Sequence, residues 1–182
     1  MLDKIYIVDF EDSFTFNIAN IIYPDVQEIK VVAHHHFFNT YFHQILTKTN
    51  RIGVVLGPGP GHPDEYSIYF EKIKILMNLA HVYLLGICLG HQMIGRVQGF
   101  RVEAAKELIH GNSVEFDFFG RKVRVQRYNS LAVYEAEEEL NLLILPCGIS
   151  YQFHPESIGT EENALFFRDL INFVMDRQEF HG

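Results

Sequence analysis

The sequence predicts an α/β fold: an open, mostly parallel β-sheet with helices on both faces and a small antiparallel annex. Runs that are apolar on both faces alternate with helix-like segments through the first half of the chain, and such strands occur in parallel sheets that are covered on both sides. Residue types around Phe119 and Gly120 instead alternate as in a hairpin. No linker, repeat or low-complexity tract is visible, so we expect one domain over residues 1–182.

The first half of the chain supplies the parallel strands, which we expect at residues 4–10, 28–33, 51–57 and 82–87. Ser13 is predicted to cap a helix that runs to about residue 22. Helical periodicity over 65–80 predicts a second helix with Ile68, Ile73, Leu76 and Leu79 on one face. A third helix is expected from Gly90 onward.

The second half supplies the annex and the end of the sheet. An antiparallel hairpin is predicted at 113–126, short strands at 140–145 and 149–154, and an amphipathic helix at 161–175.

Composition excludes several classes of function. The net charge of −8, without a basic stripe, argues against nucleic-acid binding. No apolar run reaches the roughly eighteen residues that a membrane span needs, and the N-terminal apolar run is too short for a signal peptide. Two cysteines in a chain of 182 residues do not suggest a disulfide framework. We therefore expect a cytoplasmic protein that binds neither nucleic acid nor membrane.

Cys88 lies between two glycines, in Gly86-Ile87-Cys88-Leu89-Gly90, where a buried strand turns into a helix. This spacing is typical of a nucleophile elbow, in which small flanking residues permit a tight turn. The N-terminus of the following helix favours a thiolate and can stabilise an oxyanion. The alternative is that Cys88 is a small buried apolar residue.

A thiol nucleophile requires a base, and "SYQFHPES" supplies a candidate. His154 and Glu156 are two residues apart at the end of a predicted strand, so their side chains can lie on the same side. A structural histidine is the alternative. The glycine-rich "LGPGPGHP" (56–63) leaves the carboxyl end of another strand, where ligands bind in open α/β sheets. An ordinary rigid turn is the alternative there.

Three other features are expected to be structural. The histidines at 34–36 are predicted to form a solvated loop rather than a metal site, because neighbours on an extended segment point apart. Cys147 is expected to pack in the core. The acidic run 135–140 is expected to be a solvated turn or the start of a helix. No metal or cofactor is predicted.

Several motifs occur in order along nearly the whole chain: "DFEDSFTFNI", "GPGPGHP", "GICLGHQ", "HGN", "RYNSL" and "QFHPES". Together they resemble the class I glutamine amidotransferases, whose fold is flavodoxin-like. The opening motif and the glycine-proline loop resemble the branch that serves anthranilate synthase and aminodeoxychorismate synthase. The resemblance implies a glutaminase subunit that passes ammonia from L-glutamine to a chorismate-using synthase large subunit (component I).

The resemblance also implies a role for individual residues, without a cofactor or metal. Cys88 would attack the glutamine amide, His154 would act as acid and base, and Glu156 would orient His154. The backbones of Gly59 and Leu89 would form the oxyanion hole. Glutamine would be held by Gly57, Pro58, Gly59, the Gln92 side chain, and the backbone of Ser130 and Leu131.

The chain departs from the family pattern at several places, including a shortened stretch between residues 34 and 51. Asn129 stands where the family usually has histidine, and the segments 111–127 and 131–148 are shorter than usual. The departures at Asn129 and in these two segments concern the annex and the identity of the partner. Two alternatives therefore stay open: a noncatalytic or regulatory binding module, and a stand-alone hydrolase of γ-glutamyl compounds.

Overall fold

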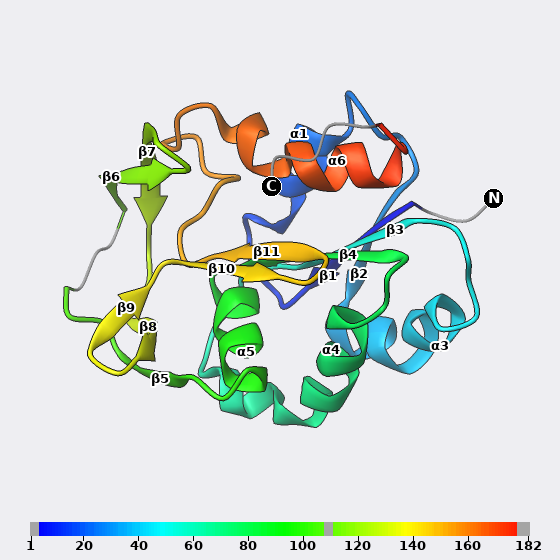
Figure 1. Cartoon of the computed structure of the whole chain (residues 1–182), viewed down its shortest axis with the longest axis horizontal. Coiled ribbons are helices and arrows are strands. Elements are labelled where there is room, and N and C mark those ends of the chain that lie inside the picture. Colours follow the sequence, from blue (N-terminus) through cyan, green and yellow to red (C-terminus); the bar gives the residue numbers. More distant parts are fainter. Residues whose placement is uncertain (1–3, 108–110, 178–182) are drawn as a thin grey trace.

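The computed structural model describes residues 4–107 and 111–177 (Figure 1). Its strands are β1 Ile5–Asp9, β2 Ile29–Ala33, β3 Ile52–Leu56, β4 Val82–Ile87, β5 Arg101–Ala104, β6 Asn112–Phe118, β7 Arg121–Arg127, β8 Leu131–Glu135, β9 Glu138–Leu140, β10 Leu142–Leu145 and β11 Gly148–Tyr151. Its helices are α1 Thr15–Ile22, α2 His34–His36, α3 Phe42–Ile45, α4 Phe70–Met77, α5 Leu89–Val97 and α6 Arg168–Val174. Shorter helical segments are the π-helical η1 Phe37–Tyr41 and the 3₁₀-helical η2 Pro63–Tyr69 and η3 Asn163–Phe167. Within the described ranges, no helix combines the length and the apolar character needed to cross a membrane.

The central sheet has six strands in the order β10-β11-β4-β3-β1-β2. Its strands run parallel except β10, which pairs antiparallel with β11 at the edge. Figure 1 shows α1 and α6 on one face of this sheet and α3, α4 and α5 on the other. The predicted fold class is confirmed, and β4 lies between β11 and β3, so the residue that follows β4 has neighbours on both sides.

The two faces of the sheet bury separate apolar cores, and the alternation of β1 shows how. Tyr6 and Val8 belong to the cluster that packs under α3, α4 and α5. Ile5 and Ile7 belong to the opposite cluster, together with Ile18 of α1 and side chains of α6. Each fully buried aliphatic side chain contributes roughly 1.5–3 kcal/mol of transfer free energy. This two-sided burial explains why the strands are apolar at consecutive positions.

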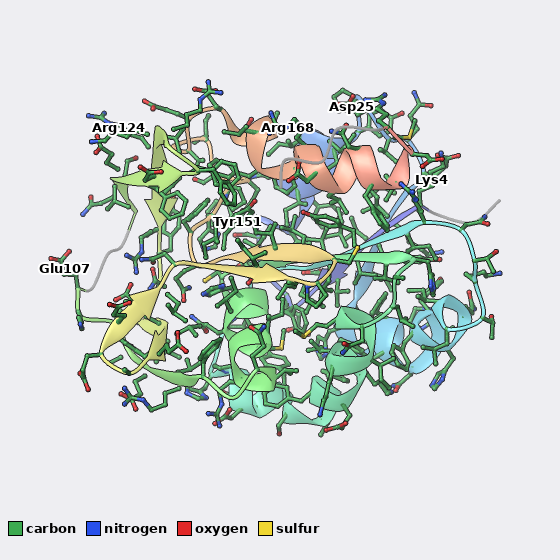
Figure 2. The ribbon with its side chains drawn as sticks, viewed as in Figure 1. Lys4, Asp25, Glu107, Arg124, Tyr151 and Arg168 are labelled. Carbon is green, nitrogen blue, oxygen red and sulfur yellow. The ribbon has the colours of Figure 1, made fainter. Side chains whose placement is uncertain are left out.

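The annex consists of two small antiparallel sheets, one of β5, β8 and β9 and one of β6 and β7. The β6–β7 hairpin turns at Phe119 and Gly120, which have φ angles of 51° and 84°. Val123 and Val125 of β7 pack into the same core cluster as Tyr151, which Figure 2 labels on the face of the sheet that α6 covers. The hairpin is therefore anchored to the central core.

Helix α1 does not begin as predicted from Ser13. It starts at Thr15, with Phe14 at the N-cap position and no side-chain cap. The preceding turn is held by aspartates instead: Asp12 Oδ1 accepts from the backbone N–H of Phe14 at 2.8 Å, and Asp9 Oδ1 accepts from the Thr15 hydroxyl at 2.9 Å. The backbone N–H of Thr15, which a Ser13 cap could have served, donates instead to the Asp12 carbonyl at 3.2 Å.

Other local predictions also need correction. The helix over 65–80 is divided into η2 and α4, and Ile68 is 74% exposed, whereas Ile73 and Leu76 are buried. The histidines at 34–36 form α2 rather than a loop, and the His34 ring stacks on Phe10 with centroids 5.3 Å apart. Of the two alternatives for the acidic run 135–140, a solvated turn and the start of a helix, the structure shows the turn, which is followed by β9. Strand β11 ends at Tyr151, three residues before His154.

Candidate active site

Cys88 occupies the turn between β4 and α5, at the centre of the sheet. Its backbone has φ 51° and ψ −100°, a strained conformation for a residue with a Cβ. The turn is held by two hydrogen bonds: Cys88 N–H donates to the Tyr151 carbonyl at 2.9 Å, and Gln92 N–H donates to the Cys88 carbonyl at 3.0 Å. Such strain persists only where surrounding structure enforces it, and it is common at reactive groups.

The two flanking glycines are required by close packing. A Cβ on Gly90 would lie 2.1 Å from the carbonyl oxygen of Leu56 on β3. A Cβ on Gly86 would lie 2.6 Å from Ile94 Cδ1 and 2.9 Å from the Ser150 Cβ. The elbow spacing therefore reflects a turn that is wedged between β3 and β11, as the small-x-Cys-x-small pattern predicts.

His154 and Glu156 lie directly behind this turn. His154 Nδ1 and Glu156 Oε1 are 2.6 Å apart, and both side chains are almost fully buried. The imidazole is also hydrogen-bonded to Cys88. Because Nδ1 is engaged by Glu156, Nε2 faces the sulfur. The structure thus brings the three residues together in the order thiol, imidazole, carboxylate.

This environment changes the protonation of His154. Burial on its own lowers the pKa of an imidazole, but the hydrogen bonds with Cys88 and Glu156 outweigh burial and raise the pKa of His154 well above 6.5. Two rings enclose the imidazole: Tyr128 at 5.1 Å and Phe14 at 6.0 Å between centroids, both edge-on. The site therefore favours a charged imidazolium next to the sulfur.

Hydrogen bonds with the β6–β7 hairpin hold the loop that carries His154 in place. His154 N–H donates to the Gln126 carbonyl at 2.9 Å, and the Thr160 hydroxyl donates to the His154 carbonyl at 2.7 Å. Gln126 Oε1 accepts from Ser157 and from Gly159 N–H. Sequence reasoning missed Gln126 and Thr160, because their role depends on a contact between segments that lie about thirty residues apart.

The glycine-proline loop lies on the other side of the cysteine turn. A Cβ on Gly59 would be 2.6 Å from Leu89 Cδ2 and 2.5 Å from Phe10 Cβ, so Gly59 and Leu89 are close neighbours. Gly57 N–H donates to the Val8 carbonyl at 3.1 Å, which extends the β1–β3 ladder to the start of the loop. The two residues predicted to form the oxyanion hole are therefore brought together beside Cys88.

Two of the predicted glutamine-binding residues, Gln92 and Leu131, are in contact. Gln92 is buried on α5, and its Nε2 donates to the Leu131 carbonyl at 3.1 Å. Asn129 Nδ2 donates to the same carbonyl at 2.9 Å. The Ser130 carbonyl accepts from Ala105 N–H at 2.9 Å, which joins it to the end of β5. Both lone pairs of the Leu131 carbonyl are thus in use.

Cys147 differs from Cys88 in position and in chemistry. It lies next to the amino end of β4, where it lines a cavity of about 470 Å³ with Arg51 and Tyr83. It packs against the core as expected, and burial raises the pKa of its thiol although Arg51 opposes this. The two cysteines therefore lie at opposite ends of the sheet.

Comparison with known proteins places this arrangement in a family. The family model described as Glutamine amidotransferase class-I matches residues 6–173. The chain is 31% identical to "Anthranilate synthase component 2" of Archaeoglobus fulgidus, over 94% of this chain and 99% of that protein. It is 33% identical to the protein of the same name from Thermococcus kodakarensis, over 93% and 96%.

Two further matches define the extent of the similarity. The chain is 30% identical to "Bifunctional protein TrpGD" of Thermotoga maritima, over 94% of this chain but only 32% of that longer protein. Among solved structures, a putative GMP synthase subunit from Thermoplasma acidophilum superposes with a TM-score of 0.71 at 18% identity, over 97% of this chain and 96% of that one. At that identity the superposition supports the fold alone.

Proposed function

Because this chain belongs to the class I glutamine amidotransferases, we propose that it is a glutaminase subunit that releases ammonia from L-glutamine for a chorismate-using synthase. The observation that carries the proposal is the Cys88 turn with His154 hydrogen-bonded to its sulfur and Glu156 behind His154. We place this activity in the cytoplasm.

The mechanism begins with the sulfur as a thiolate paired with the His154 imidazolium. The thiolate attacks the side-chain carbonyl carbon of glutamine, and the electron pair of the carbonyl moves onto oxygen. Backbone N–H groups of Gly59 and Leu89 would stabilise this oxyanion. When the carbonyl re-forms, the C–N bond breaks and the imidazolium proton passes to the leaving nitrogen, so that ammonia departs and a γ-glutamyl thioester remains.

The second half-reaction reverses the role of the imidazole. His154, now neutral, takes a proton from water, and the oxygen attacks the thioester carbonyl. The C–S bond then breaks, glutamate leaves, and the thiolate–imidazolium pair is restored. Glu156, buried and 2.6 Å from Nδ1, keeps the ring oriented and stabilises its charge through both steps.

Glutamine binding would use Gly57, Pro58, Gly59, Gln92, Ser130 and Leu131. Since Gln92 donates to the Leu131 carbonyl in the present structure, we expect that its amide exchanges this partner for the substrate. The names of the relatives described above favour anthranilate synthase over aminodeoxychorismate synthase as the complex in which the chain works. The tryptophan pathway is accordingly the first candidate, and the folate pathway the second.

Ammonia release tests the proposal directly. Purified chain is assayed with glutamine alone, with an anthranilate synthase large subunit, and with an aminodeoxychorismate synthase large subunit. We expect activity in the presence of one partner and its loss in Cys88→Ser. A glutamine-like diazo-ketone should label Cys88 and spare Cys147, so Cys147→Ser is the matched control.

The same assays separate the alternatives. Unlabelled Cys88 and no ammonia with either partner would favour a binding module without catalysis. Rapid turnover without any partner would favour a stand-alone γ-glutamyl hydrolase.

A further inference from the structure

A buried carboxamide lies beside the Cys88 sulfur and is not part of the thiol–imidazole–carboxylate set. Gln152 follows β11 and is completely buried, and its Nε2 is 3.7 Å from Cys88 Sγ. Tyr151 and Phe153 point into the apolar core, whereas Gln152 and His154, two residues apart, both reach the sulfur. A polar side chain buried at this position needs a physical reason.

The orientation of the Gln152 amide follows from its neighbours. A carboxamide can be turned end for end, so the identity of the atom that faces the sulfur must be deduced from hydrogen bonding. The Leu131 carbonyl can only accept, which requires that Gln92 presents its NH₂ group to it at 3.1 Å. The same NH₂ group lies 3.4 Å from Gln152 Oε1. Gln152 therefore presents its own NH₂ group to Cys88.

A second amide that donates to the Leu131 carbonyl, that of Asn129, is oriented by Arg127 of the annex. Arg127 can only donate, and its Nε lies 3.0 Å from Asn129 Oδ1, so the Asn129 NH₂ group must face the Leu131 carbonyl. Glu139 of β9 holds the Arg127 guanidinium by an ion pair whose side chains are only 11% and 14% exposed. The Arg127 guanidinium and the Leu131 carbonyl thus determine how the side-chain amides between β9 and Cys88 are oriented. These amides are Asn129, Gln92 and Gln152.

We propose that Gln152 is a further catalytic residue, whose side-chain N–H donates to the Cys88 sulfur and stabilises the thiolate. This inference rests on the proposed glutaminase function. An N–H donor interacts more strongly with a charged acceptor than with a neutral one, so it favours the thiolate over the thiol. The sulfur then has two donors, the imidazolium of His154 and the amide of Gln152.

The test measures the ionisation of Cys88 rather than turnover. The rate of alkylation by iodoacetamide is followed against pH, without glutamine, in full-length chain that carries Cys147→Ser so that only one thiol reacts. Gln152→Glu keeps the size of the side chain and removes the donor, and Gln152→Leu removes all polarity. We expect both to raise the midpoint of the alkylation profile by about one pH unit or more.

Asn172→Leu is the matched control, because it removes a buried carboxamide that lies on α6, outside the amide network beside the sulfur. Its midpoint should stay at the wild-type value. An unchanged midpoint in folded Gln152→Glu and Gln152→Leu overturns the inference. Failure of both variants to fold, as judged by circular dichroism, overturns it as well, because it would assign Gln152 a structural role.

The outcome is separable from that of the proposed function. If no partner elicits ammonia release from the wild type, the glutaminase proposal fails, even where the midpoint shifts. If ammonia is released and the midpoint does not move, only the role of Gln152 fails.

Discussion

His91 should make the fold sensitive to mild acid. It lies on α5 and is fully buried, with Nε2 2.8 Å from the Leu140 carbonyl and Nδ1 2.9 Å from the Ser150 hydroxyl. A carbonyl only accepts, so Nε2 carries the proton and Nδ1 accepts from the hydroxyl. The neutral tautomer therefore satisfies both ring nitrogens, and a second proton would place a charge in the interior.

Burial, helped by the positive charge of Arg127 and only partly opposed by the hydrogen bonds, lowers the pKa of His91 from 6.5 to about 4. The unfolded chain binds this proton near pH 6.5 and the folded chain does not, so stability is lost as the pH falls from 6.5 to about 4. At 1.36 kcal/mol per pH unit, the loss reaches about 3 kcal/mol.

His91→Gln provides the comparison, because its amide can bond to the same two groups and does not titrate. Urea unfolding of both proteins is measured at several pH values between 4 and 7.5. We expect the stability of the wild type relative to the variant to decrease steadily below pH 6.5. A difference that stays constant across the range would refute the assignment of a buried neutral imidazole. Groups common to both proteins cancel in this difference.

Three further variants test the site and its supports. Glu156→Gln, which removes the charge behind the imidazole, should lower kcat for glutamine hydrolysis about 10²–10⁴-fold; near-wild-type kcat would contradict the role given to the carboxylate. Gly90→Ala places a Cβ 2.1 Å from a β3 carbonyl oxygen and should lower the free energy of unfolding in urea by about 2–4 kcal/mol. The control Gly99→Ala, whose Cβ meets nothing within 4 Å, should lower it by about 1 kcal/mol. Glu139→Gln weakens the ion pair with Arg127 and should cost about 1–3 kcal/mol and raise KM for glutamine; unchanged values for both would show that the annex network is dispensable.

Elements of the central sheet were predictable because their signals are local. The strand at 82–87 was predicted with the bounds that the structure has, since a strand buried on both faces is a continuous apolar run. His154 and Glu156 pair as their spacing of two residues predicted, but they do so across a turn rather than along a strand, because β11 ends at Tyr151. Their catalytic roles stay predictions.

Features that depend on tertiary contacts were not predictable. Ser13 has the right chemistry for a helix cap, but Asp9 and Asp12 occupy the turn. Glu139 was expected to be solvated, yet its side chain is only 14% exposed and forms an ion pair with Arg127, which is twelve residues away and on another strand. The position of Gln152 could have been predicted, because side chains alternate in direction along "ISYQFH" and this places Gln152 on the same side as His154.

The antiparallel bridge between Gln126 and His154 joins the annex hairpin to the residue that we propose as the catalytic acid and base. Because the His154 N–H donates to the Gln126 carbonyl, this amide hydrogen can exchange with heavy water only when the β6–β7 hairpin separates from the loop. Its exchange rate therefore reports how often the hairpin separates. The deuterium uptake of that one amide, measured with and without a bound synthase, would read out how firmly the hairpin is seated and whether assembly tightens it.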